Sequence, residues 1–290
     1  MNAPQLRSDA IAATPRNWLP TVGSLQRHFY PDIVARDPVA TFVRRLDRLV
    51  KPTDEVLDLG AGAGELNAYA LKGRVRRLVG IDLDPRVCAN PLLDAGLRAD
   101  IYALPFRDAS FDVVFAIYVL EHVDRGAALV AEIRRVLKPG GRLIVNTPHL
   151  KQSFLRRVRH ALGQSDEKHG HLRPGYTIEG LSAMLEPDFV IRDQRTYSRF
   201  FSELVDTALN WAVERTGKRS SAKGLVVTSD DLAKSRRLFR LYSLVYPLVW
   251  AVTRLDALVP ASGYMLIAAA RRTGGTRGRE PAPAHPAAGS

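Results

Sequence analysis

The amino-acid sequence predicts a doubly wound α/β fold, in which helices cover both faces of a mostly parallel sheet. Apolar runs of strand length alternate with stretches of helical period from about residue 50 onward, and this alternation is typical of successive strand–helix units. A glycine-rich turn directly follows the first run, and an acidic residue ends the second. Such features mark the carboxyl edge of the sheet, where open α/β folds bind ligands.

Strands are expected where apolar residues run uninterrupted between turn signals. The candidates are residues 54–59, 77–82, 97–100, 111–116, 142–146, 188–196 and 263–270. A helix over residues 125–137 is expected between the fourth and fifth strands. Another helix, over 38–50, precedes the first strand and ends before Pro52, because proline cannot donate the hydrogen bond that a helix requires.

Amino-acid composition and the periodicity of apolar residues divide the chain into five segments. We expect an N-terminal extension and helix (1–50), a core (51–196), a helical insertion (197–262), a final core strand (263–271) and a disordered tail (272–290). Within the core, residues 150–185 are expected to lie over the ligand site. The tail combines glycine and proline with no apolar period, so it cannot bury enough surface to fold. The insertion replaces a short connection, and loops of that length carry structure or function of their own.

The overall composition sets the broad class of protein. With 290 residues and 46% hydrophobic content, the chain can bury a sizeable core. Cys88 is its single cysteine, which excludes an intramolecular disulfide and a multi-cysteine zinc site. Residues 1–7 have no apolar stretch behind their charge, so no secretory signal is expected. We therefore expect a cytoplasmic protein, peripheral to the inner face of the membrane if its insertion binds lipid.

The glycine turn at residues 58–64 reads Asp-Leu-Gly-Ala-Gly-Ala-Gly. Its glycines permit positive φ and allow a ligand to approach the backbone closely. The spacing differs from the G-x-G-x-x-G of dinucleotide sites, which disfavours an NAD-type oxidoreductase. Asp58 adds a negative charge beside the turn and suits a cofactor that carries an ammonium group. Asp82 ends the next apolar run, where a carboxylate can accept both hydroxyl groups of a ribose.

These motifs resemble those of the class I S-adenosylmethionine (SAM)-dependent methyltransferases, from about residue 51 to about residue 146. The matching elements, in order, are residues 58–64, 80–82, 99–101, 111–122 and 137–143. The resemblance implies a Rossmann-like sheet with an antiparallel last strand, and SAM as the cofactor. The cofactor-binding residues that it implies are Asp58, Gly60, Ala61, Gly62, Gly64, Asp82, Leu83, Asp100, Ile101, Ala116 and Tyr118. Asp100 is expected beside the adenine amine.

The resemblance implies methyl transfer to a small-molecule, glycan or lipid-linked acceptor. The aromatic and basic residues of the insertion favour a hydroxyl group as the acceptor, with an amine as the second choice. The net charge of +12 also suits nucleic acid. However, residues 116–120 read Ala-Ile-Tyr-Val-Leu, where DNA and RNA amino-methyltransferases carry an Asn/Asp-Pro-Pro-aromatic stretch. Cys88 also lies in the wrong place for a Pro-Cys nucleophile, so a nucleic-acid acceptor is disfavoured. An RNA-directed methyltransferase and a SAM-binding protein without transferase activity remain the alternatives.

A hydroxyl acceptor must lose its proton, and histidine is the usual base near neutral pH. Three histidines follow the fourth and fifth strands, where connections face the acceptor. We expect His171 to be the base, then His149, then His122, with Tyr118 and Tyr176 shaping the cavity.

A metal site would most simply use His169 and His171 with Asp166 or Glu167. Magnesium sites, however, use carboxylate and other oxygen ligands rather than imidazoles. A solvated turn is the preferred interpretation of these residues, and no metal is predicted.

The insertion contains an aromatic stripe. Its members are Phe239, Tyr242, Tyr246 and Trp250. Spacings of three, four and four place them on one side of a helix. Arg240, Arg254 and Asp256 leave too short an apolar run to cross a bilayer. Two interpretations remain open: the stripe packs on the core, or residues 236–254 contact an anionic membrane surface, as the excess of basic over acidic residues between 214 and 240 suggests.

Overall fold

The computed structural model describes residues 49–62, 71–151, 153–164, 171–215, 248–249 and 251–274. Most of the predicted helix at 38–50 and nearly all of the predicted tail lie outside these ranges. So do all four aromatic residues of the stripe. The statements below concern the described residues alone.

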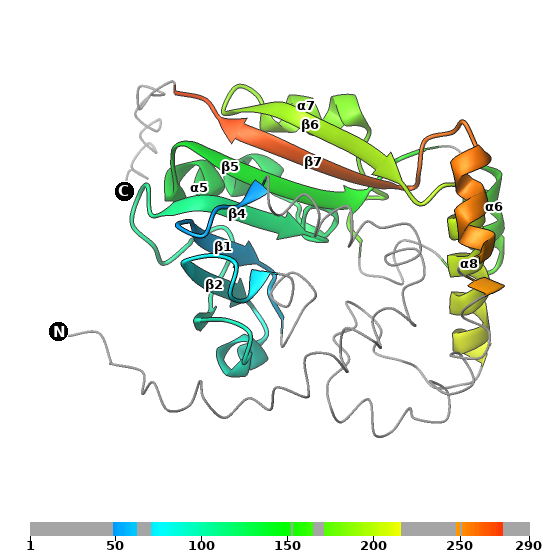
Figure 1. Ribbon diagram of the computed structural model, residues 1–290, viewed down its shortest axis with the longest axis horizontal. Coiled ribbons are helices and arrows are strands. Elements are labelled where there is room, and N and C mark those ends of the chain that lie inside the picture. The colour runs from blue at the N-terminus through cyan, green and yellow to red at the C-terminus, as the bar shows by residue number, and fades with distance from the viewer. Residues whose placement is uncertain are drawn as a thin grey trace, which may run out of the picture.

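Seven strands form one sheet in the order β3-β2-β1-β4-β5-β7-β6 (Figure 1). The strands are β1 (Glu55–Leu59), β2 (Arg77–Asp82), β3 (Ala95–Arg98), β4 (Phe111–Ile117), β5 (Leu137–Pro148), β6 (Phe189–Tyr197) and β7 (Met265–Arg272). Neighbouring strands from β3 to β5 pair in parallel, whereas β7 is antiparallel to both β5 and β6. This topology confirms the predicted fold class, including the antiparallel last strand.

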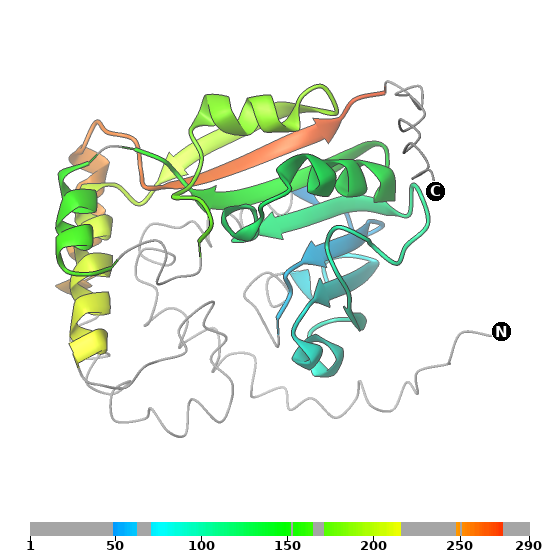
Figure 2. The same cartoon turned by 180° about the vertical axis from the view of Figure 1, so that it is seen from behind.

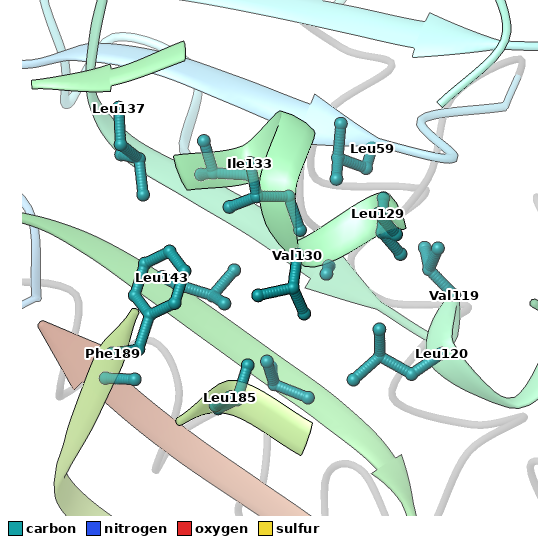
Figure 3. Packing of buried hydrophobic residues seen from close by; sticks show 14 of the residues in the cluster. Leu59, Val119, Leu120, Leu129, Val130, Ile133, Leu137, Leu143, Leu185 and Phe189 are labelled. Atoms are coloured by element: carbon teal, nitrogen blue, oxygen red, sulfur yellow. The ribbon is translucent and has the colours of Figure 1, made fainter. Parts of the chain in front are cut away.

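The helices are α5 (Gly126–Val136), α6 (Phe154–Ala161), α7 (Ile178–Leu185) and α8 (Phe200–Arg215). Three short 3-10 segments accompany them: η2 (Pro85–Ala89), η3 (Leu120–His122) and η5 (Leu255–Leu258). The helix α5 buries Leu129, Val130, Ile133 and Val136, a spacing that places its apolar side chains on one stripe. In Figure 3, side chains of α5 meet those of β1, β5 and α7 in one cluster.

The central strands are apolar because both of their faces are covered. Leu57 and Leu59 of β1 point into the cluster that contains α5. Val56, one residue earlier, packs on the opposite face with Leu78 and Phe115. Because alternate residues of a strand face opposite sides, this division fixes the register of β1 and brings its carboxyl end beside that of β4.

Three strands differ from their predicted bounds by two residues or more: β3, β5 and β7, the last of which spans Met265–Arg272 instead of residues 263–270. The strand β3 begins two residues earlier than expected, because the backbone N–H of Asp94 already bonds Leu78 O at 2.8 Å. The predicted start of β5 at residue 142 is where its regular pairing with β4 begins. The strand itself starts at Leu137, and the pairing shifts register before Arg142; Gly140 in this stretch has φ +73°.

The described parts of the insertion are helical and lie beyond the carboxyl ends of β4 and β5, next to α6 (Figures 1 and 2). Buried Asp256 joins the two ends of this segment. Its carboxylate accepts the backbone N–H groups of Arg199 at 2.8 Å and Phe201 at 2.5 Å, which are otherwise unpaired at the start of α8. Among the described residues, no helix combines the length and the hydropathy needed to cross a bilayer.

Candidate functional site

The glycine turn leaves β1 at Gly60, which has φ +69°, and Gly62 has φ +53°. Both values fall in the left-handed region that favours glycine. The backbone N–H of Ala61 bonds Ile81 O at 3.0 Å, which holds the turn against β2. The predicted positive φ is therefore present at two of the three glycines. Gly64 lies outside the described residues.

Asp82 ends β2 and faces this turn. Its Oδ2 accepts the N–H of Gly62 at 3.0 Å, and its Oδ1 accepts the N–H of Asp84 at 2.8 Å. A carboxylate offers about four lone-pair directions, so two remain for the hydroxyl groups of a ribose. The turn and the carboxylate are thus held together without a ligand. Sequence reasoning placed Asp82 at the ligand but did not foresee that it also fixes the turn.

Asp58 is fully buried, one residue before the end of β1. Carboxylates are seldom buried without a partner, and this one has an interaction partner in the structure. Its proposed role beside an ammonium group stays a prediction.

The other predicted cofactor residues divide by burial. Leu83 follows Asp82 in the chain and is 67% exposed. Asp100 is exposed, and its Oδ1 accepts the N–H of Tyr102 at 2.9 Å. Ile101 is half-buried against the core.

The small residues Ala61 and Ala116 differ from the rest, because both are fully buried in the two core clusters. Both residues are 0% exposed as whole residues, backbone included, so their role at the cofactor stays a prediction.

Tyr118 follows β4 with φ +57° and is 43% exposed. A left-handed conformation costs a non-glycine residue roughly 1–2 kcal/mol, and such strain gathers at functional sites. Its backbone N–H bonds Asn146 O at 2.8 Å, which holds the conformation. The side chain of buried Asn146 in turn accepts the hydroxyl group of Tyr197 at 2.8 Å. Sequence reasoning missed Asn146, although a polar residue in an apolar strand was the available signal.

Glu121 is a second residue that sequence reasoning did not single out for the chemistry. It lies in η3 and is fully buried. Its Oε2 accepts the hydroxyl group of Thr147 at 3.2 Å, whereas its Oε1 accepts no hydrogen bond from the residues that the model covers. Burial raises the pKa of Glu121 to about 7, because removing a carboxylate from water disfavours its charged form.

His122 and His171 lie beside Glu121. Their rings meet edge to face with centroids 5.0 Å apart. One ligand-type atom from each of Glu121, His122 and His171 lies within 4.8 Å of those of the other two. We call these three residues the Glu–His–His cluster. Its burial decreases from Glu121, which is fully buried, through half-buried His171 to exposed His122.

Hydrogen bonds to the backbone carbonyls of residues 120–124 hold the segment after His171 beside η3. The N–H of Leu172 bonds Glu121 O at 2.8 Å, and the hydroxyl group of Tyr176 bonds Leu120 O at 3.3 Å. The guanidinium of Arg173 donates to the backbone carbonyls of Val123 at 3.2 Å and of Asp124 at 3.1 Å. These contacts bring His171 to the end of β4, although it follows β5 in the chain.

His149 follows β5, and its hydrogen-bond partner is not a member of the Glu–His–His cluster. Its Nδ1 is 2.8 Å from the carbonyl oxygen of Gly263, so Nδ1 carries the proton and Nε2 is the basic nitrogen. The structure thus brings together two of the three candidate bases, His122 and His171. His169, Asp166 and Glu167, the metal ligands considered from sequence, lie outside the described residues, and the prediction of no metal stays a prediction.

Residues 57–145 match the family model described as a methyltransferase domain. A ubiquinone/menaquinone biosynthesis C-methyltransferase, UbiE, from Burkholderia mallei is 38% identical over 106 residues, which cover 33% of this chain and 44% of that protein. The chain thus spans less than half the length of the curated relatives that it matches first.

Two solved structures show the same fold at low sequence identity. The phosphoethanolamine N-methyltransferase 2 of Haemonchus contortus, in complex with SAM, has a TM-score of 0.52 at 17% identity and covers 93% of this chain and 61% of its own. The 4+2 cyclase SpnF has a TM-score of 0.52 at 19% identity and covers 81% of both chains. From the family match, the sheet order and the turn geometry, we conclude that this chain carries a class I SAM-dependent methyltransferase domain.

Proposed function

We propose that this protein transfers the methyl group of SAM to a hydroxyl oxygen of a small-molecule, glycan or lipid-linked acceptor. The observation that carries the proposal is the pairing of a preformed cofactor turn with two histidines at the same edge of the sheet. Gly62 and Asp82 are bonded to each other in the cofactor turn. The rings of His122 and His171 meet where β4 ends. When bound, SAM supplies an electrophilic methyl group on a positively charged sulfur.

The protein's own residues have two tasks in such a reaction. Asp82 and the glycine turn hold the donor, because alignment of donor and acceptor contributes most of the rate in a displacement of this kind. A histidine near the acceptor takes the hydroxyl proton as the oxygen attacks. We infer that His171 does so, since the loop that carries it is bonded to η3, and that Tyr118 shapes the acceptor cavity.

The acceptor atom does not transfer from the relatives. UbiE is named as a C-methyltransferase, but the matched domain ends at residue 145. The segments that would contact the acceptor, residues 150–185 and 197–262, lie beyond it. The preference for oxygen therefore rests on the histidines. Carbon acceptors of low pKa, or an amine that is already neutral, would place a smaller demand on a base.

Two alternatives remain. SpnF, whose name describes a cyclase, has this fold, and a fold by itself does not fix the reaction. A protein that binds SAM without transferring its methyl group would therefore suit the same turn. An RNA-directed enzyme is the second alternative, and steep salt dependence of RNA binding would reveal it. Incubation of the protein with labelled SAM and candidate acceptors, followed by mass spectrometry of the products, separates these functions.

Replacement of Asp82 by alanine is expected to weaken SAM binding by about one to two orders of magnitude. The loss of a charge-assisted hydrogen bond costs roughly 1.5–3 kcal/mol, and the variant also loses the bond that holds Gly62. Calorimetric titration with SAM measures the effect. Asp84→Ala is the matched control, because Asp84 pairs with exposed Arg86 outside the proposed site. Equal affinities of the two variants for SAM would remove Asp82 from the site.

We further propose that residues 236–254 contact an anionic membrane surface. Leu248 lies in the described part of this stretch and is 68% exposed, and Leu258, just after the stretch, is 78% exposed. Arg254, between these two residues in the sequence, is also exposed. The aromatic stripe itself lies outside the described residues.

Vesicles with anionic lipid are accordingly expected to bind the protein at low salt and to release it as salt rises. Each surface Lys or Arg contributes about 1 kcal/mol to such binding, and salt screens the attraction. Co-sedimentation measures the effect, and Tyr246→Ser with Trp250→Ser should abolish it while SAM binding persists. If this double variant unfolds instead, the stripe belongs to the core and the membrane proposal fails.

A further inference from the structure

The strongest feature outside the cofactor turn is the Glu–His–His cluster. Glu121 and His122 are consecutive in η3, and His171 reaches them from a separate segment that five hydrogen bonds hold against residues 120–124. Three residues of ligand type, from two segments, therefore converge on one point whose geometry the backbone maintains. Packing alone would favour apolar residues at such a meeting point.

The carboxylate of Glu121 supplies an independent observation. It is fully buried, and its Oε2 accepts a hydrogen bond from the hydroxyl group of Thr147. Its Oε1 accepts none from the described residues. Buried polar atoms in folded proteins nearly always have a partner, and an unpaired one costs about 1–3 kcal/mol. A positive ion next to Oε1 would remove this cost.

We propose that Glu121, His122 and His171 bind one divalent transition-metal ion, such as Zn²⁺, Mn²⁺ or Fe²⁺. Two imidazoles and one carboxylate suit these ions rather than Mg²⁺, which prefers oxygen ligands. The prediction of no metal considered His171 with residues 166–169. The ligands proposed here are a different set, and the fold had to bring it together.

The cluster resembles an open site more than a closed structural one. Three protein ligands leave a coordination position for another molecule, and His122, one of the three, is exposed. In its role, which rests on the proposed methyl transfer, the ion would take the place of His171 as the group that removes the proton, because it would bind the acceptor hydroxyl oxygen and lower its pKa. The O–H bond then breaks with the electron pair left on oxygen, and the proton goes to water. No oxidant or reductant takes part.

The test is metal binding by the full chain, measured without acceptor. Protein freed of its purification tag and of metal by a chelator is dialysed against Zn²⁺, and the bound ion is counted by mass spectrometry. We expect about one ion per chain. His122→Ala and His171→Ala are expected to weaken binding by more than about tenfold, and Glu121→Gln likewise while keeping the Thr147 bond. His160→Ala, which removes an exposed histidine of α6, is the matched control and should bind as the wild type does.

Several results would overturn the proposal. One is wild-type protein that retains no Zn²⁺, and another is undiminished binding by both His122→Ala and His171→Ala. Binding lost in His169→Ala but kept in His122→Ala would place the ion elsewhere. Because His122 is exposed, its variant is expected to fold, which circular dichroism checks. SAM titration of the same samples is separate: absent SAM binding would refute the proposed function while leaving the metal result intact.

Discussion

Replacement of His171 by alanine is expected to lower kcat by about 10²–10⁴-fold once an acceptor is known, because that is the usual contribution of a group that moves a proton in the transition state. The affinity for SAM should change little, since the cofactor turn lies on β1 and β2. Steady-state kinetics with a SAM titration distinguishes the two effects. The expected loss is the same whether His171 takes the proton itself or holds an ion that acidifies the acceptor.

His149→Ala is the comparison for this variant. Its ring bonds Gly263 O on the other side of β5, and the candidate order places it second. Full turnover by His171→Ala with a large loss in His149→Ala would transfer the role to His149. Full turnover by both variants would mean that no base is needed, as for an acceptor that is already deprotonated or neutral.

Replacement of Gly62 by valine is expected to reduce SAM affinity by more than about 100-fold. The residue has φ +53°, where a β-branched side chain is strongly disfavoured. The branched Cβ would also occupy the space in which the cofactor approaches the backbone. Calorimetry or equilibrium dialysis with SAM measures the loss.

Gly73→Val separates these two causes. Gly73 has φ +75°, and a Cβ there would meet nothing within 4 Å, so this variant incurs the backbone strain away from the site. Both variants should lower the melting temperature, whereas only Gly62→Val should lose SAM. Normal SAM binding by folded Gly62→Val would show that the glycine turn is not the cofactor site.

The sheet and the turn could be predicted from the sequence because their causes are local. A run such as residues 55–59 is apolar enough to be buried on both faces. The glycines after it predict a turn with positive φ, a conformation that is unfavourable for other residues. Asp82 was predictable for the same reason, since it ends a strand of the same sheet. The start of β3 was missed by two residues because the pairing of Asp94 with β2 depends on the neighbouring strand rather than on its own residue type.

The meeting of His122 with His171 could not be predicted in the same way. It depends on where the chain between α6 and α7 returns to η3, and this return is set by Arg173 and by backbone bonds between distant segments. Glu121 was seen in the motif, but the lack of a partner for its Oε1 among the described residues depends on the packing around it. Likewise, the pattern of Ala116 is that of any strand residue, and only the fold shows that its side chain faces the core.

The position of β7 in the sheet, between β5 and β6, affects the order in which the strands can pair while the chain is being synthesised on the ribosome. Within the sheet, β6 pairs only with β7. The residues of β7 are among the last of the described residues to be synthesised. The strands β1 to β5 can associate as they emerge, because each finds its neighbour among residues already made. Until residues 265–272 leave the exit tunnel, β6 has no partner on either edge, and β5 keeps one edge open. An open strand edge is prone to pair with other chains, so slowed or interrupted translation before residue 265 should favour aggregation of nascent chains.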